Sequence, residues 1–179
     1  PIGVLFLLAM SSVAVYGAAT GLVPEDHELR PASPYGVSKM AAEAYARVYG
    51  HMFEPVDICV ARIGNPYGPG QRRLAIYDLA RRAVDHGAPL TLWGDGLQKR
   101  DFVHASDVAR ALILIAQRGQ KGATYNVGSG VASTLLAVAT HVAQAAGLDR
   151  EAVEPNNEED PGKVREFLPS IARIRALGF

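Results

Sequence analysis

Apolar residues occur along the chain in two kinds of run, and the two kinds alternate. Short, mostly apolar runs such as 4–10 and 56–63 are typical of parallel strands that are buried on both faces. The longer stretch 34–53 repeats small apolar residues at three- and four-residue spacing, which predicts a helix. The same patterns predict further helices over 74–87, 105–119, 132–147 and 170–179, and further strands over 90–93, 100–104, 123–127 and 164–168.

Capping and turn residues place the ends of these elements. Ser33 before Pro34 is a sequence that begins helices, and we expect Ser106 and Thr134 (or the serine before it) to cap two later helices. The Gly-Asp-Gly turn at 94–96 predicts that the strands on either side of it form a hairpin.

Strands that alternate with helices at this spacing predict an α/β fold built on a parallel sheet. In such sheets, ligands bind beyond the carboxyl ends of the strands. Three loops meet that description: Ser11 and Ser12 after the first strand, residues 64–70 after the second, and residues 128–130 after the strand over 123–127.

Composition narrows the choice of partners. Acidic and basic side chains balance at 18 each in 179 residues, so the charge does not favour nucleic acid or an anionic membrane. The single cysteine, Cys59, excludes a disulfide within the chain, and we expect it to be a small buried hydrophobic side chain. The first residues resemble a signal peptide, but no positive charge precedes the apolar run, which is too short to span a bilayer. We expect a cytoplasmic protein without a bound metal.

Tyr35 and Lys39 carry the first chemical signal. They lie four residues apart, on one face of the helix predicted over 34–53. A free tyrosine titrates near pH ~10, and a neighbouring ammonium group favours the phenolate, so such a pair can shuttle protons. The same spacing also arises by chance in many helices. Ser12 strengthens the signal, because a hydroxyl at the end of a buried strand can reach a substrate oxygen; an ordinary turn serine is the alternative.

Five segments in order resemble the extended short-chain dehydrogenase/reductase superfamily: SSVAVYG, SPYGVSK, GNPYGPGQ, GDGLQKRDFVHASDVARA and YNVGSG. Within it the chain is similar to the NAD-dependent epimerase/dehydratase family, which acts on sugar nucleotides, and to its UDP-glucose 4-epimerase-like members. The resemblance implies a partial Rossmann-like parallel sheet with helices on both faces, plus a smaller C-terminal substrate-binding region.

The resemblance also implies a role for each residue of the first two segments. Ser12 would hydrogen-bond the reacting sugar hydroxyl, Tyr35 would be the acid/base, and Lys39 would bind the nicotinamide ribose. The expected cofactor contacts are Ser11, Tyr35, Lys39 and Gly64, with NAD as the cofactor and NADP left open. In the implied reaction, Tyr35 takes a proton from the sugar hydroxyl as a hydride passes to NAD⁺. The keto-sugar then turns and takes the hydride back on its other face.

Three residues are implied contacts to the substrate besides Ser12: Asn65, Arg100 and Arg165. A planar guanidinium suits phosphate oxygens. The alternatives are an Asn-Pro turn residue at position 65 and a solvated hairpin charge at position 100. Further residues of the motifs are expected to be surface charges or structural groups: Arg72, Arg73, His104 and Asp107.

One departure from the family pattern concerns the cofactor. The Gly-rich phosphate loop TGxxGxxG is absent, and residues 64–70 cannot replace it because their prolines break the turn-to-helix geometry. We therefore expect residues 1–65, with later returns at about 104–130, to be the C-terminal half of an NAD-binding Rossmann domain. Residues 66–179 would be mainly a substrate-binding region, truncated at its C-terminus.

The residues after Ser12 separate the possible reactions. Sugar-nucleotide 4,6-dehydratases need an acidic pair there, and this chain has Val13 and Ala14, which cannot transfer a proton. Epimerisation at sugar C4 is therefore the leading hypothesis. An NAD(P)-dependent reductase or dehydrogenase is one alternative, and a non-catalytic piece that cannot bind the cofactor alone is another. The resemblance implies a nucleotide-sugar substrate and a homodimer formed through the helices over 34–53 and 74–87; packing within the subunit is the alternative use of those helices.

Overall fold

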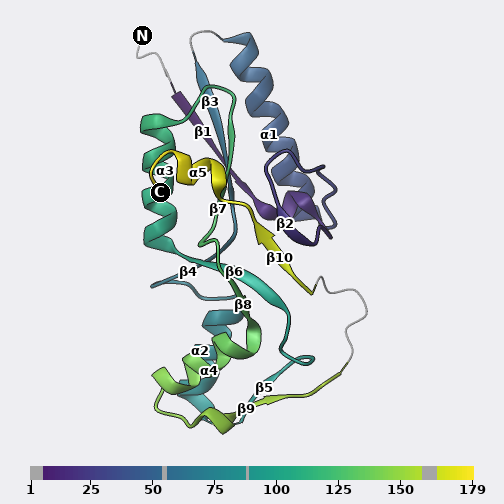
Figure 1. The fold of residues 1–179 in the computed structure, drawn as a ribbon, viewed down its shortest axis with the longest axis vertical. Coiled ribbons are helices and arrows are strands. Elements are labelled where there is room, and N and C mark those ends of the chain that lie inside the picture. The colour runs from purple at the N-terminus through teal and green to yellow at the C-terminus, as the bar shows by residue number, and fades with distance from the viewer. Residues whose placement is uncertain (1–5, 54–55, 88, 159–164) are drawn as a thin grey trace.

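The structure, a computed structural model, describes residues 6–53, 56–87, 89–158 and 165–179. Its central sheet is parallel, with the strand order β1 (Phe6–Ser12), β3 (Asp57–Ile63), β7 (Thr124–Val127). Helix α1 (Pro34–Met52) covers one face of this sheet, and α3 (Ala105–Arg118) with the short α5 (Ala172–Ala176) covers the other (Figure 1). The α/β fold with helices on both faces of a parallel sheet is confirmed.

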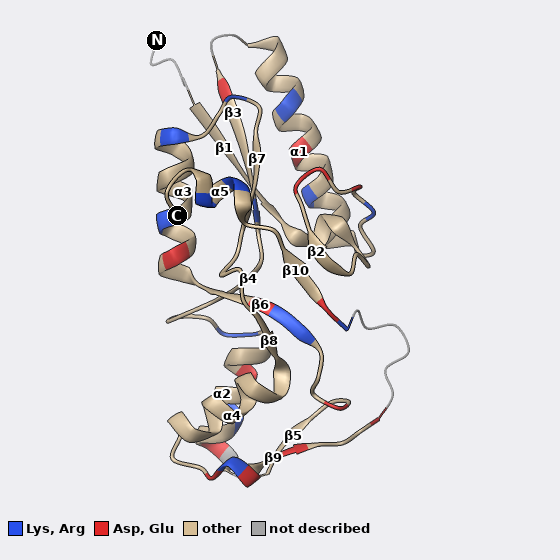
Figure 2. Ribbon diagram, in the orientation of Figure 1, with Lys and Arg blue, Asp and Glu red and all other residues tan. Residues whose placement is uncertain are grey.

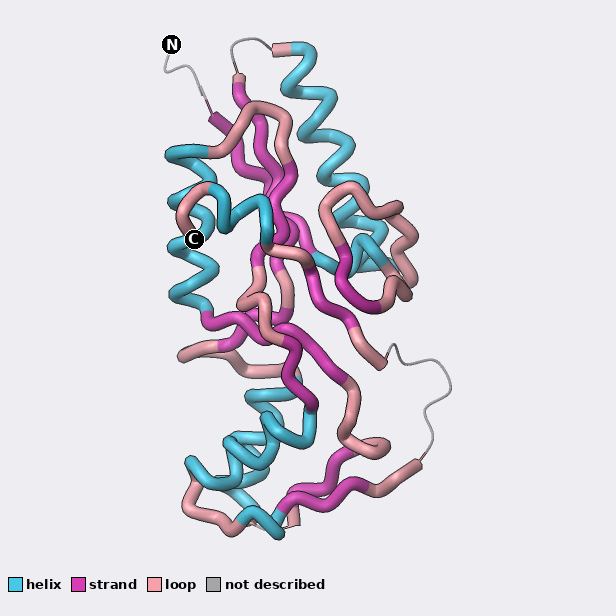
Figure 3. The backbone as a smooth tube through the Cα atoms, viewed as in Figure 1, coloured by secondary structure: helices cyan, strands magenta, loops and turns pink. Residues whose placement is uncertain are grey.

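The remaining elements form three smaller sheets and a helix pair. The sheets join β2 (Gly21–Val23) to β10 (Phe167–Pro169), β5 (Leu90–Leu92) to β9 (Val153–Pro155), and β4 (Asn65–Tyr67) to β6 (Lys99–His104) and β8 (Ala132–Thr134). The helix pair is α2 (Ala75–His86) and α4 (Leu135–Ala145), and two 3₁₀ turns are η1 (Val13–Tyr16) and η2 (Arg150–Ala152). The parallel strands β1, β3 and β7 run toward the α2–α4 part of the molecule (Figure 1). Their carboxyl ends therefore lie near the middle of the molecule, between the upper and the lower helices of Figure 3.

Three apolar cores hold the described parts of the chain, and the smallest of them packs Val15 and Val23 against Phe167. The first lies between the central sheet and α3, where Cys59, Val127 and Ile115 are fully buried. The second lies among α2, α4 and β5 and contains Leu90 and Ala139. Of these residues, Cys59 is the one whose burial the sequence predicts individually.

Strand β1 differs from its prediction. The run over 4–10 predicts burial on both faces, yet Leu7 is 41% and Met10 55% exposed. Among the described residues β1 pairs on one edge only, with β3, so its other side lacks the cover that a central strand receives. Residues 4 and 5 of the predicted strand lie outside the described residues.

The predicted hairpin around residues 94–96 is wrong. Gly94 and Gly96 do adopt positive φ angles of 79° and 69°, as a turn requires, but β5 and β6 do not pair with each other. Strand β5 pairs with β9 instead, because Leu90 and Leu92 are buried in the second core.

The helix caps are predicted with mixed success. Ser33 and Thr134 cap α1 and α4, where their hydroxyl oxygens accept hydrogen bonds from backbone N–H groups. Ser106 does not cap α3: His104 does, through Nδ1, which accepts from the Ser106 N–H at 3.2 Å. Among the described residues, no helix is both long enough and apolar enough to cross a membrane.

Candidate active site

A cavity of about 810 Å³ lies where the carboxyl ends of β1 and β3 meet the start of α1. Five of the predicted site residues line it: Ser12, Tyr35, Gly64, Asn65 and Arg100. The structure therefore brings together residues from four of the five sequence motifs at the edge of the sheet where the topology predicts a ligand.

The start of α1 places Tyr35 against η1. Gly36, the next residue, packs so closely that a Cβ atom there would lie 2.6 Å from the backbone oxygen of Ala14. The phenol ring of Tyr35 is 56% exposed and faces the cavity. Lys39 lies one turn further along, with Nζ 5.7 Å from the centre of the Tyr35 ring and donating to the backbone oxygen of Met10 at 3.1 Å. The two side chains share one helix face, as their spacing predicts.

Ser11 and Ser12 are adjacent but face opposite ways, because successive strand residues alternate. Ser12 lines the cavity, and its Oγ accepts the N–H of Ala14 at 3.2 Å, which leaves its own O–H available to donate. Ser11 is 4% exposed and its Oγ donates to Oε1 of Glu43 at 2.6 Å. The hydroxyl of Ser11 is thus directed into the protein and away from the cavity.

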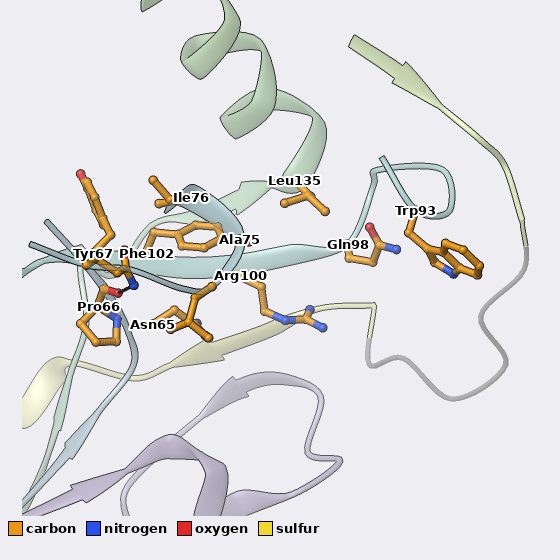
Figure 4. Close-up of a pocket in the computed structure, with 12 residues that line it drawn as sticks. Asn65, Pro66, Tyr67, Ala75, Ile76, Trp93, Gln98, Arg100, Phe102 and Leu135 are labelled. Carbon is orange, nitrogen blue, oxygen red and sulfur yellow. Dashed lines mark hydrogen bonds between the residues drawn. The ribbon is translucent and has the colours of Figure 1, made fainter. Parts of the chain in front are cut away.

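A second cavity of about 260 Å³ continues the first toward α2 and α4 (Figure 4). Asn65 and Arg100 line both cavities, so the two form one elongated cleft. The far end has an aromatic and aliphatic wall: Tyr67, Ile76, Trp93, Phe102 and Leu135. A cleft with polar groups at one end and an apolar wall at the other suits a ligand with a sugar or phosphate part and a flat ring.

Arg100 is the principal cation of this cleft. It belongs to the stretch of β6 coloured blue in Figure 2, and its Nη1 donates to the backbone oxygen of Lys99 at 2.8 Å. Burial lowers the pKa of the Arg100 guanidinium, and no carboxylate of the described residues forms an ion pair with it. A half-buried guanidinium that forms no ion pair within the described residues is suited to an anionic ligand such as a diphosphate.

Asp101, the residue after Arg100, holds the backbone of the loop that follows β7. Its buried carboxylate accepts the N–H groups of Ser129 and Gly130 at 2.7 and 2.8 Å, which ties the loop after β7 to β6. The backbone oxygen of Asp101 accepts Nδ2 of Asn65 at 2.9 Å. Asn65 is therefore oriented by the protein, and the loop over 128–130 is fixed in place beside the cleft.

Leu74 lies at the junction of the two cavities in an unusual conformation. Its φ of 79° and ψ of 165° fall in a region that is favourable only for glycine. Such backbone strain, of about 1–3 kcal/mol, persists where surrounding structure imposes it, which occurs often at binding sites.

Arg165 lies outside the cleft, and Arg73 lies at it. Arg165 lines neither cavity; its side chain is 81% exposed and pairs with Asp95 at 3.1 Å. Arg73, expected to be a surface charge, is exposed but lines the larger cavity. Neither position could be read from the sequence, since both depend on how loops fold back over the cleft.

Sequence reasoning missed a buried ion pair beside the site. Arg62 and Glu43 are each 2% exposed, and two nitrogens of the guanidinium donate to the carboxylate at 2.9 and 2.8 Å. Burial would raise the pKa of Glu43, but hydrogen bonds from Arg62 and Ser11 outweigh it and leave that pKa below its usual value. A signal existed: a lone arginine within an apolar strand must find a buried partner.

Comparison with known proteins gives consistent matches. The profile described as "NAD dependent epimerase/dehydratase family" matches residues 3–128. The dTDP-glucose 4,6-dehydratase of Streptomyces griseus is 33% identical over 99% of this chain and 54% of its own length. The uncharacterized UDP-glucose epimerase YtcB of Bacillus subtilis is 33% identical over 91% of this chain and 54% of its own length. The structure of MoeE5 in complex with UDP-glucose and NAD superposes with a TM-score of 0.83 at 37% identity, covering 99% of this chain and 60% of MoeE5. The chain thus spans little more than half the length of these relatives.

Proposed function

Because the chain belongs to the NAD dependent epimerase/dehydratase family, we propose that the protein epimerises a nucleotide sugar at C4 with NAD as cofactor. Similarity alone does not choose between the two reactions of the family, since a dehydratase and an epimerase are equally identical to this chain at 33%. The carrying observation is that Val13 and Ala14 line the cavity beside Ser12. Neither side chain can protonate a leaving hydroxyl, which a dehydration requires.

In this mechanism Tyr35 removes the proton of the sugar C4 hydroxyl and later returns it. Ser12 donates its O–H to the same substrate oxygen and holds it near the phenol. The ammonium of Lys39 lies 5.7 Å from the centre of the Tyr35 ring, on the same face of α1. The bound cofactor would supply the redox chemistry, as NAD⁺ accepting the hydride from C4 and as NADH returning it. Rotation of the keto-sugar between the two transfers inverts C4.

The residues near Tyr35 fit the nicotinamide-ribose end of the cofactor. Lys39 uses one of its three donors on Met10, so two remain for ribose hydroxyls. Gly64 lines the cavity, and a Cβ atom there would lie 3.3 Å from the backbone oxygen of Val127, so a glycine lets β3 end close against β7 at this edge of the cavity. Residues 1–179 contain no Gly-rich phosphate loop, and the proposal leaves NADP open as the cofactor.

Asn65 and Arg100 are the proposed contacts to the substrate diphosphate, since both line the two cavities. The relative MoeE5 was solved with UDP-glucose, which supports a nucleotide sugar as substrate class. Arg165 would have to leave Asp95 to take part, because the two are 3.1 Å apart and Arg165 is outside both cavities.

A homodimer is the proposed assembly. Helix α1 exposes a row of large apolar side chains on the surface away from the sheet: Tyr45 (71% exposed), Val48 (52%), Tyr49 (55%) and Met52 (67%). Burying such a row against a second copy would remove apolar area from water. Sedimentation of the natural protein tests this assembly.

The direct test of function is conversion of UDP-glucose by the natural protein with NAD. Formation of UDP-galactose to equilibrium, without net NADH, is the expected result; a 4-keto-6-deoxy sugar or stoichiometric cofactor turnover would exclude epimerisation. Tyr35→Phe should lower kcat by about 10²–10⁴-fold, the usual contribution of a positioned acid/base. The matched control, Tyr77→Phe on α2, should keep normal activity.

A further inference from the structure

The residue four positions after Lys39 continues the row that carries the proton shuttle. Tyr35, Lys39 and Glu43 are spaced by four, so all three lie along one face of α1. Lys39 donates to Met10 and Glu43 accepts from Ser11, at 3.1 and 2.6 Å. Two consecutive residues of β1, immediately before Ser12, are therefore each bonded to this one row.

The segment after Ser12 is bound to the same ion pair. Nη1 of Arg62 donates to the Tyr16 hydroxyl at 2.8 Å, and that hydroxyl donates to Oδ1 of Asn126 at 2.7 Å. Tyr16 closes the turn η1, which begins directly after Ser12. The Glu43–Arg62 pair thus holds the chain on both sides of Ser12, through Ser11 before it and Tyr16 after it.

We infer that Glu43 and Ser11 are positioning residues that set the register between Ser12 on β1 and Tyr35 on α1. This inference rests on the proposed proton shuttle. Stability alone does not explain the Glu43–Arg62 ion pair, because a buried ion pair often stabilises a protein no more than apolar residues of similar volume do. Its three directed bonds to one carboxylate, from Ser11 and from two nitrogens of Arg62, instead fix the orientation of Glu43.

Position matters here because catalytic groups must be held closely. A misplacement of about 1 Å can lower a rate by roughly 10²-fold. Ser12 lies at the end of an edge strand that pairs only with β3 among the described residues, so the ladder restrains it from one side. The bond from Ser11 to Glu43 supplies restraint from the direction of α1, where Tyr35 is attached.

Ser11→Ala isolates this restraint. It removes one hydroxyl while both Arg62 bonds to Glu43 remain, so the fold is retained. In the natural protein with NAD and UDP-glucose, we expect kcat to fall by about 10- to 100-fold with the KM values changed by less than about twofold. Ser11→Thr, which keeps a hydroxyl, should recover most of the loss. The control Thr140→Val deletes a hydroxyl that bonds within α4 and should leave kcat unchanged.

A raised KM for NAD with normal kcat would show that Ser11 contacts the cofactor instead and would overturn the inference. Normal kcat and KM in folded Ser11→Ala would overturn it as well. A second measurement needs no turnover: hydrogen exchange of the amides in residues 12–17 should speed up by about tenfold in Ser11→Ala and remain normal in Thr140→Val. If exchange rises while the natural protein converts no nucleotide sugar, the proposed function fails and the positioning role stands. Unchanged exchange in this segment overturns the positioning role.

Discussion

The two faces of the central sheet hold their helices by different means. Toward α3, the sheet presents Cys59, Ala61 and Val127, which pack into an apolar core with Ile115. Toward α1, the carboxyl ends of the same strands present Ser11, Arg62 and Asn126, which form a buried hydrogen-bonded network. Side chains alternate along β3, so residues 59 and 61 point one way and residues 58, 60 and 62 the other. Ile58 and Val60 are buried and apolar, so the contrast is confined to the carboxyl end of the strand, where Arg62 lies.

The two faces therefore differ in function: apolar packing stabilises α3 on the sheet, and directional hydrogen bonds fix the position of α1. Apolar burial is strong but non-directional, so a helix packed on hydrocarbon can shift slightly at little cost. Hydrogen bonds to a buried carboxylate lose energy steeply when distance or angle changes. The helix with Tyr35 and Lys39 lies on the directional side, and α3, which carries none of the proposed catalytic residues, lies on the apolar side.

Breaking the buried ion pair between the sheet and α1 should have the largest effect on the free energy of unfolding. Arg62→Met leaves Glu43 buried with only the half-exposed Arg47, 3.6 Å away, as a cationic neighbour, and we expect the free energy of unfolding to fall by about 3 kcal/mol. Urea denaturation measures this. The double variant Arg62→Met/Glu43→Leu, which removes both charges, should regain most of the loss. Arg81→Met, which breaks the exposed pair with Asp85, should cost less than about 1 kcal/mol; equal costs for Arg62→Met and Arg81→Met would refute the contrast.

Removing a buried apolar side chain between the sheet and α3 should lower the free energy of unfolding by a similar amount, without changing kcat. Ile115→Ala removes a fully buried side chain from α3, with an expected loss of about 2–5 kcal/mol. The kcat of the folded Ile115→Ala protein should stay near normal. If it falls as far as that of Ser11→Ala, then placement is shared by both faces and the comparison fails.

The smallest expected effect is the loss of stability in acid that comes from Glu43, the buried carboxylate between the sheet and α1. Burial would raise the pKa of Glu43, but its bonds to Arg62 and Ser11 hold that pKa below the ordinary value of 4.5. A carboxyl with a lower pKa in the folded state binds fewer protons when folded, so its stabilisation is complete above pH 4.5 and is lost as pH falls through the lower value. Between about pH 5 and 3, the free energy of unfolding should fall more steeply in the natural protein than in Glu43→Gln. Parallel curves would contradict this, and Asp85→Asn on the surface is the control.

The sequence predicts what depends on local pattern. The cap at Ser33, the face shared by Tyr35 and Lys39, and the position of Ser12 at a strand end all follow from neighbours in the chain. Short strands such as β4 do not, because β4 contains Pro66 and exists only through its pairing with β6, far along the chain. Proline is tolerated there because β4 is an edge strand.

The same limit applies to the site. Glu43 and Arg62 are separated by 19 positions, and only the packing of α1 on β3 reveals that they meet. The pairing of Arg165 with Asp95, which are 70 positions apart, cannot be predicted from the sequence pattern either. Residues whose role is local can be predicted, whereas residues that join two elements become visible only in the folded chain.

The cleft has a thermodynamic consequence, because its two ends belong to different cores. Ser12 and Tyr35 come from the sheet region, and Ile76 and Leu135 come from the helices of the second core. A ligand that fills both cavities therefore contacts both regions at once. By mass action, a ligand at a hundredfold excess over its Kd stabilises the bound arrangement by about 2.7 kcal/mol. Occupancy of the cleft would thus couple the unfolding of the two cores, and the molecule would melt more cooperatively with its substrate than without it.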